Sequence, residues 1–282
     1  MIIKNVFEVA EQALATKPEH VKIDWSTVDK VIERMRKDGP PKFFEDTDQY
    51  KTGLYVEVLK ELVASSINYC YWYGVSDIRP NGVSSTAMYQ CLEYAFSQSK
   101  SYELRLDSII HTMIELLSVN RFPMLEERKR HLLELLDDRK GENFANAVVS
   151  KQADIDMMCR YFTGFASDIF LKRASLFFIQ IYRKFGWYKD IELPVPADYQ
   201  VPKILRHFGC IWYQSSLEED IYEGKLIPKN SLEEIQIRAA TIIVCKRMRE
   251  VLGWHIGDVD TYLWTKRKLT DMPFHCTITC DY

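Results

Sequence analysis

The chain has 282 residues, of which 47% are hydrophobic and 27% are charged. This is enough to bury a full core, and it excludes a disordered chain. The 37 Lys and Arg residues and 40 Asp and Glu residues give a net charge of -3, without the basic excess typical of proteins that bind duplex DNA. No apolar run approaches the roughly 20 residues that span a bilayer, and the N-terminal residues do not resemble a signal peptide. We therefore expect a cytoplasmic protein with one compact domain over residues 1–282. The alternative organisation is two closely packed helical lobes.

Helical periodicity dominates the chain, with apolar residues at i, i+3 and i+4 predicting about ten helices. The first clear helix begins at Ser26-Thr27-Val28-Asp29 and is stopped by Gly39-Pro40-Pro41. Five further helices are expected, at Tyr55–Tyr71, Ser85–Gln98, Leu104–Val119, Leu125–Asp138 and Phe170–Phe185. Weak strand candidates are Tyr73–Val83, around a Pro80-Asn81-Gly82 turn, and Cys276–Cys280. The sequence thus predicts an all-α fold, or nearly so, with minor strand content.

Two helices of the second half have well-defined ends. An amphipathic helix follows Asp198 and Tyr199, with Pro202 in its opening turn and Gly209 just beyond its end. Later, Ser231-Leu232-Glu233-Glu234 forms a capping box before Ile235–Leu252, which ends at Gly253. No internal repeat or flexible linker divides the chain.

The six histidines and seven cysteines show no spacing that predicts a metal site. The sequence has no His-Glu-x-x-His pair and no Cys-x-x-Cys pair. His275, Cys276 and Cys280 offer too few ligands, and we interpret them as packing of the tail. Because Gly-rich phosphate loops are also absent, we predict neither a metal nor a cofactor such as ATP or NAD.

Three groups of residues are candidates for a site, and each has a structural alternative. Lys172-Arg173 lies in an apolar helix, so these side chains either snorkel to its rim or point into a polar pocket. Asp198 either caps the following helix or faces a ligand. The aromatic rings near Asp260, those of Tyr262 and Trp264, are either core residues or surfaces on which a heterocyclic base stacks. Spacing alone does not separate these alternatives.

Several collinear segments together resemble the queuosine salvage protein family, the queuosine 5′-phosphate N-glycosylases. The matching segments are 18–23, 67–72, 123–128, 172–174, 197–202 with Leu205 and Gly209, 234–238, 260–264 and 273–275. The match therefore runs through nearly the whole chain. Any one of these segments would be a weak signal, whereas their common order is specific.

The resemblance implies an all-α fold related to the helix-hairpin-helix DNA glycosylases. It also implies hydrolysis of the N-glycosidic bond of a queuosine nucleotide, which releases the base queuine. The essential acidic residue of the family falls on Asp198 and its lysine on Lys172. A fixed carboxylate would stabilise an oxocarbenium-like sugar, and a nearby lysine would keep that carboxylate ionised.

The remaining substrate contacts follow from the same resemblance. Aromatic walls for the deazapurine are expected from Trp72, Tyr199, Tyr262 and Trp264, beside Asp260. Arg238 and His275 are candidates for binding a 5′-phosphate, with an ion pair to Glu234 as the competing role of Arg238.

Some positions depart from the family pattern. The tail after His275 lacks the usual basic residues, Gln236 stands where Glu is usual, Ser175 replaces Gln, and the segment after Trp72 is short. We therefore expect a small-molecule substrate that is either a queuosine nucleotide or a related deazaguanine nucleoside. The alternatives are a glycosylase for a modified DNA base, which the balanced charge disfavours, and a non-catalytic binder of queuine or a related base.

Overall fold

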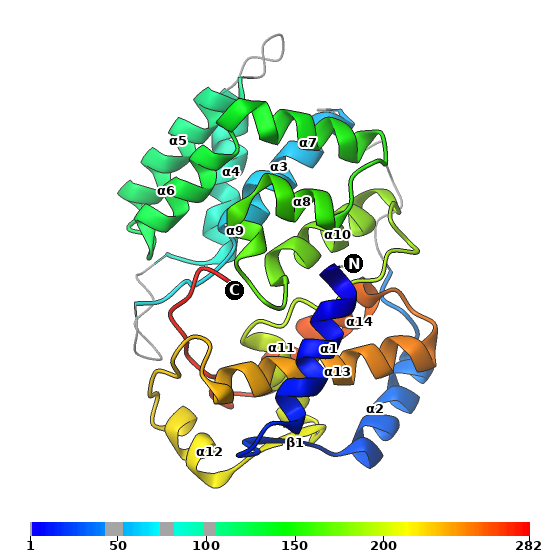
Figure 1. Cartoon of the computed structure of the whole chain (residues 1–282). Coiled ribbons are helices and arrows are strands. Elements are labelled where there is room, and N and C mark those ends of the chain that lie inside the picture. Colours follow the sequence, from blue (N-terminus) through cyan, green and yellow to red (C-terminus); the bar gives the residue numbers. More distant parts are fainter. Residues whose placement is uncertain (1, 43–52, 74–81, 99–104) are drawn as a thin grey trace.

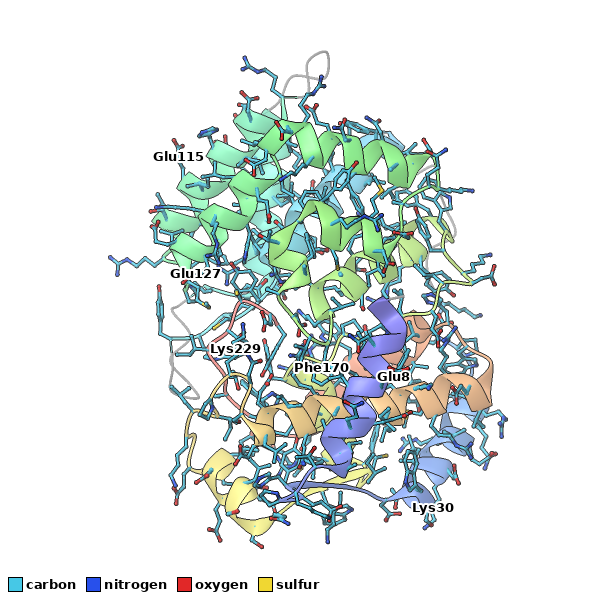
Figure 2. All side chains as sticks on the ribbon, viewed as in Figure 1. Glu8, Lys30, Glu115, Glu127, Phe170 and Lys229 are labelled. Carbon is cyan, nitrogen blue, oxygen red and sulfur yellow. The ribbon has the colours of Figure 1, made fainter. Side chains whose placement is uncertain are left out.

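The computed structural model describes residues 2–42, 53–73, 82–98 and 105–282. Two groups of helices lie one above the other in Figure 1, and the C-terminal segment passes between them. The upper group holds α3 to α10, and the lower group holds α1, α2 and α11 to α14. One continuous core of buried apolar side chains joins both groups. Charged residues such as Glu8, Lys30 and Glu115 lie on the outer surface, whereas Phe170 is buried where the groups meet (Figure 2).

The fold is nearly all helical, as predicted. The helices of the upper group are α3 (Leu54–Ile67), α4 (Ser85–Gln98), α5 (Leu106–Val119), α6 (Leu125–Glu134), α7 (Lys140–Val149), α8 (Ile155–Tyr161), α9 (Thr163–Ala166) and α10 (Lys172–Phe185). Those of the lower group are α1 (Ile2–Ala15), α2 (Trp25–Asp38), α11 (Gln200–His207), α12 (Ser215–Tyr222), α13 (Leu232–Leu252) and α14 (Ile256–Thr265). Short 3₁₀ turns, η2 (Asp137–Arg139) and η3 (Lys266–Leu269), follow α6 and α14.

The described strands form one small antiparallel sheet that the sequence did not predict. In it β1 (Val21–Ile23) pairs with β2 (Ile211–Tyr213), and Lys22 lies opposite Trp212. Strands of three residues are too short to show a two-residue alternation. The strand predicted at Cys276–Cys280 is wrong, because within the described residues only Cys276 forms a β-bridge there, with Leu226. Most of the other candidate, Tyr73–Val83, lies outside the described residues.

Helix ends follow local signals where these are strong. Ser231 caps α13 by accepting a hydrogen bond from Glu234 N, and Gly253 ends that helix with a φ of 67°. In α2 the cap is Asp24, two residues before the predicted start.

Two predicted helices were too long. The chain leaves α3 after Ile67, and it leaves α6 after Glu134, where Asp138 and Arg139 take left-handed backbone conformations.

Arg128 explains the early end of α3. Its guanidinium is fully buried and donates hydrogen bonds to the carbonyl oxygens of Ile67, Tyr69 and Cys70. It also packs over the Tyr69 ring, 4.4 Å from the centroid. These contacts replace the helical hydrogen bonds of the last carbonyls. The segment 68–72 is therefore held as a non-helical wall, although its apolar residues continue the helical pattern.

Gln236 on α13 fixes the end of α1. Its side-chain amide donates to the carbonyl oxygens of Ala13, Thr16 and Pro18, at 3.0, 3.0 and 3.2 Å. Its Oε1 accepts from His20 N at 2.7 Å. A carboxylate offers no donors to the three carbonyls, so the structure gives a physical reason for glutamine at this departure from the family pattern.

We expect Gln236→Glu to destabilise the protein by about 1–3 kcal/mol at neutral pH, because a buried carboxylate would face three carbonyl oxygens. Its pKa would be raised in the folded state, so the loss should shrink as the pH falls below that pKa. Urea unfolding at two pH values measures both effects. The control is Gln152→Glu, the same change at an exposed site. Equal stability of the two variants would contradict this role of Gln236.

Candidate functional site

A cavity of about 540 Å³ lies beside α10 and contains most of the predicted site. The described residues of its wall come from the segment after α3, the start of α4, one face of α10, the segment before α11 with the first residue of that helix, α14, η3 and the C-terminal residue. From α10 the wall includes Lys172, Leu176, Gln180 and Arg183, which share one helix face because they lie about one turn apart. The opposite face of α10 carries core residues such as Phe177 and Phe178. The apolar helix therefore presents a polar stripe to the cavity.

Lys172 is the first residue of α10, and its side chain is 4% exposed. Its main-chain N donates to Asp168 Oδ2 at 2.7 Å, and its Nζ donates to the carbonyl oxygen of Asn68 at 3.0 Å. Burial lowers the pKa of Lys172 to about 8, although the charge of Asp198 opposes this shift. Lys172 thus points into a polar pocket and does not snorkel to solvent.

Asp198 directly precedes Tyr199, the N-cap position of α11, and its side chain both caps the first turn of that helix and lines the cavity. Its Oδ1 accepts hydrogen bonds from Gln200 N at 2.7 Å and Val201 N at 3.3 Å. Burial raises the pKa of Asp198, and the positive charge of Lys172 and the two backbone donors lower it in part. The sequence left open whether Asp198 caps the following helix or faces a ligand site, and in the structure it does both.

Lys172 and Asp198 influence each other's pKa but do not form a salt bridge among the described contacts. Both line the same cavity. A substrate group bound in this cavity would therefore lie near both the ammonium and the carboxylate. The electrostatic interaction supports the charged forms of both residues.

The predicted aromatic residues take different places. Tyr199 and Trp264 belong to the wall, and Trp264 is 39% exposed at its rim. Trp72 lies behind the described wall, with its ring 4.4 Å from Tyr199 in an edge-to-face contact. Tyr262 does not belong to the described wall, because its hydroxyl is turned away and donates to Asp38 Oδ2 at 2.6 Å. The prediction that Tyr262 forms an aromatic wall for the base is therefore corrected. Trp72 packs against Tyr199 from behind and does not itself form the described wall.

Asp260 lines the cavity as a buried carboxylate. Its Oδ2 accepts from Arg183 Nη2 at 2.8 Å. Burial raises the pKa of Asp260, Arg183 lowers it, and the like charge of Asp198 raises it. Arg183 shares the cavity-facing side of α10 with Lys172 but lies near the other end of the helix.

Arg238 and His275 are not placed to bind a phosphate in the described cavity. Arg238 is 1% exposed and is already paired with Asp168 at 2.7 Å and with Glu234 at 3.4 Å. His275 is 1% exposed and contacts the hydroxyl of Tyr282 at 3.2 Å. Burial and two nearby arginines lower the pKa of His275 to about 3, so its ring is neutral near pH 7. The competing role of Arg238, an ion pair with Glu234, is the one observed.

The structure adds Arg267 to the site. It lines the cavity and lies over the ring of Trp264, with its Cζ 3.3 Å from the centroid. Among the described residues no carboxylate forms an ion pair with it. The basic run Lys266-Arg267-Lys268 was the available sequence signal. Ser84, Ser85 and Thr86, at the start of α4, add hydroxyl groups to the wall.

The described residues contain neither a cluster suited to a metal ion nor a helix suited to a membrane. No group of three His, Cys, Asp or Glu side chains is arranged to hold a metal ion. None of the described helices combines the length and apolar character needed to cross a membrane.

The fold and cavity define a helical protein with a carboxylate and a buried lysine beside flat aromatic walls, which is an arrangement suited to a nucleoside or nucleotide. The family model described as queuosine salvage protein matches residues 61–282. The chain therefore belongs to the queuosine salvage protein family.

Three relatives carry the name queuosine 5′-phosphate N-glycosylase/hydrolase. The protein of Sphaerobacter thermophilus is 31% identical over 189 residues, that of Dictyostelium discoideum 29% over 184, and that of Bos taurus 25% over 199. Each alignment covers 57% of this chain. The chain spans only 57–58% of the length of these relatives.

We expect Lys172 to titrate near pH 8, because burial lowers its pKa. In Asp198→Asn its pKa should fall further, since the carboxylate charge that raises it is removed. NMR of protein with ¹³C-labelled lysines measures both titrations, and the exposed Lys268 serves as the reference. A Lys172 pKa that does not respond to Asp198→Asn would show that the two charges do not interact.

Proposed function

We propose that this protein hydrolyses the N-glycosidic bond of queuosine 5′-monophosphate, or of a closely related deazaguanine nucleoside, and releases queuine. The observation that carries the proposal is the meeting of Asp198, from the segment before α11, and Lys172, from α10, in one cavity of a chain of the queuosine salvage family. The names of the relatives support the same reaction. The cavity volume of about 540 Å³ lies within the usual range for small-molecule sites.

The chemistry requires negative charge at the sugar. When the bond between C1′ and the base nitrogen breaks, its electron pair leaves with the base and positive charge develops on the ribosyl ring. The Asp198 carboxylate stabilises that charge. Water then adds to C1′ and loses a proton, while the departing nitrogen gains one, so the balance is addition of one water molecule.

The other groups of the cavity orient the substrate. Lys172 favours the ionised form of Asp198 and can donate a hydrogen bond to a sugar oxygen. Tyr199 and Trp264 provide flat surfaces for the base. Asp260 accepts hydrogen bonds, as the amino and lactam N–H groups of a deazaguanine require.

Incubation with queuosine and with its 5′-monophosphate, followed by mass detection of free queuine, tests the proposal. Release of queuine from either compound is expected, and release from neither would refute the activity. Asp198→Asn should remain folded, because Asn is nearly as good a helix cap as Asp. It should turn over at least about a hundredfold more slowly, because a neutral amide cannot stabilise the ribosyl cation. Near-normal hydrolysis by this variant would leave Asp198 with its capping role alone.

We further propose that Arg267 binds the 5′-phosphate, because it is a cation of the described cavity wall without a described ion-pair partner. Arg267→Met should lower kcat/KM for the nucleotide about tenfold or more, since a charged hydrogen bond contributes about 1.5–3 kcal/mol. Hydrolysis of the nucleoside should change little. Lys268→Met removes the same charge from an exposed neighbour and is the control. Equal losses on nucleotide and nucleoside would exclude the phosphate role.

A further inference from the structure

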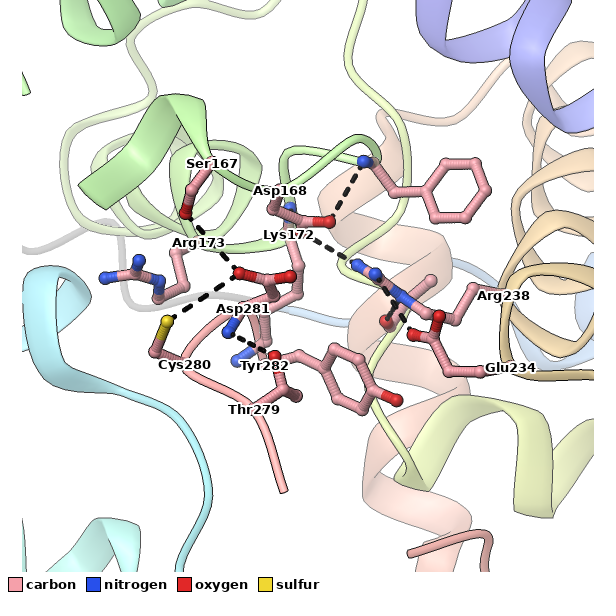
Figure 3. A network of polar contacts seen from close by, with 12 residues as sticks. Ser167, Asp168, Lys172, Arg173, Glu234, Arg238, Thr279, Cys280, Asp281 and Tyr282 are labelled. Atoms are coloured by element: carbon pink, nitrogen blue, oxygen red, sulfur yellow. Dashed lines mark hydrogen bonds and ion pairs between the residues drawn. The ribbon is translucent and has the colours of Figure 1, made fainter. Parts of the chain in front are cut away.

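Arg238 lies at the centre of a buried polar network that reaches the backbone beside two residues of the cavity wall, although Arg238 itself is not part of the described wall. Figure 3 shows its guanidinium between Asp168 and Glu234, beside the ring of Tyr282. Arg238, Asp168 and Glu234 are each at most 2% exposed. A buried guanidinium such as that of Arg238 needs partners for nearly all its N–H donors, because an unpaired buried charge is costly.

One arm of the network ends at Lys172. Arg238 Nη2 donates to Asp168 Oδ2 at 2.7 Å. The same carboxylate accepts from Lys172 N at 2.7 Å and from Phe170 N at 3.0 Å. Asp168 therefore organises the start of α10, and Arg238 holds Asp168.

The other arm ends beside Asp198. Arg238 Nε donates to the carbonyl oxygen of Ala197 at 3.0 Å. Ala197 is fully buried and directly precedes Asp198 in the chain. A single guanidinium on α13 thus fixes the backbone next to each of the two residues that carry the proposed reaction.

We propose that Arg238 is a positioning residue that sets the separation of Lys172 and Asp198 across the cavity. The proposal rests on the proposed function for its consequence in catalysis. It replaces the phosphate-binding role that the sequence suggested for this residue. Arg238 acts through Asp168 and Ala197, and it contacts neither side chain of the pair in the described structure.

The shape of the guanidinium suits this role. Its donors have fixed directions in one plane, so contacts to Ala197 and Asp168 are set together. The rings of Phe170 and Tyr282 lie 4.9 and 4.4 Å from Arg238 Cζ and hold the plane between them. A lysine ammonium has no fixed fork and cannot reproduce both directions.

A changed separation should alter the charges of the pair. Lys172 interacts with the carboxylates of Asp198, Asp168 and Asp260, which raise its pKa, and with Arg173, which lowers it. If Asp198 moves away, the pKa of Lys172 falls. The same movement raises the pKa of Asp198, because it loses the stabilising charge of Lys172. The pH range in which both are charged therefore narrows from both sides.

The decisive variant is Arg238→Lys, with Arg206→Lys as the matched control. Arg206 is 7% exposed and also binds a carbonyl, that of Pro273, and a carboxylate, that of Glu218, but lies outside the described cavity wall. We expect Arg238→Lys to lower kcat about 10–100-fold, because a misplacement near 1 Å can cost about a hundredfold. KM should change less than kcat, and the pH profile should narrow. Arg206→Lys should lower thermal stability while leaving kcat and the profile unchanged.

A second readout does not depend on turnover. In ¹³C-lysine NMR spectra, the pKa of Lys172 should fall below about 8 in Arg238→Lys and stay unchanged in Arg206→Lys. Asp168→Glu, which keeps the negative charge beside Lys172 but lengthens the side chain that Arg238 holds, provides the same test if Arg238→Lys does not fold.

The outcomes separate this proposal from the proposed function. An inactive wild-type protein refutes the glycosylase activity, while a shifted Lys172 titration in Arg238→Lys still supports positioning. An active wild-type protein whose Arg238→Lys variant keeps kcat, pH profile and Lys172 pKa refutes positioning. A loss of activity that Arg206→Lys reproduces in proportion to its loss of stability also refutes it.

Discussion

The buried ion pair between Arg238 and Asp168 joins the two groups of helices where the cavity lies. Asp168 belongs to the turn before α10 in the upper group, and Arg238 belongs to α13 in the lower group. Removing one member of such a pair leaves an uncompensated charge and typically costs about 3–5 kcal/mol. Replacing both members by apolar side chains is often neutral or stabilising. Stability alone therefore does not explain the pair, whereas the proposed role of Arg238, alignment of α10 with the segment before α11, would explain it.

A second arginine shapes the facing wall in a comparable way. Arg128 gathers the carbonyls of Ile67, Tyr69 and Cys70, which leaves the carbonyl of Asn68 for the ammonium of Lys172. The C-terminal residue closes the same region, since Cys70 N donates to the carbonyl oxygen of Tyr282 at 3.0 Å. These main-chain groups are thus paired before any ligand binds, and the ammonium of Lys172 has an acceptor in the carbonyl of Asn68. Such preorganisation is what electrostatic catalysis requires.

Local signals in the sequence were sufficient for much of the helical fold. The bounds of α4 were predicted correctly, and the Ser231 cap and Gly253 end of α13 were confirmed, because these features depend on residues a few positions apart. The end of α3 was missed because it is decided by Arg128, about sixty residues further along the chain. The three-residue strands were missed because pairing, not propensity, defines them. The predicted single domain and the relation to helix-hairpin-helix glycosylases remain predictions.

The sequence also predicted only part of the candidate site. Lys172, Asp198, Tyr199, Asp260 and Trp264 were found from the family resemblance and share the cavity. Their roles remain proposals. Tyr262, Arg238 and His275 were misplaced because sequence similarity identifies which residues matter without showing whether they face a ligand or support those that do. Arg267 was missed because a basic run on a surface turn is usually solvated.

The position of Asp198 shows why a helix cap can also serve in catalysis. The cap uses Oδ1, which accepts both backbone hydrogen bonds, and these hold the carboxylate in one orientation. Because Oδ1 is committed to the helix, Oδ2 is the oxygen available to a substrate. The backbone donors and Lys172 also offset part of the desolvation that raises the pKa of Asp198. A carboxylate buried without them would tend to bind a proton and lose the charge that the ribosyl cation requires, so the cap supports the proposed chemistry as well as the helix.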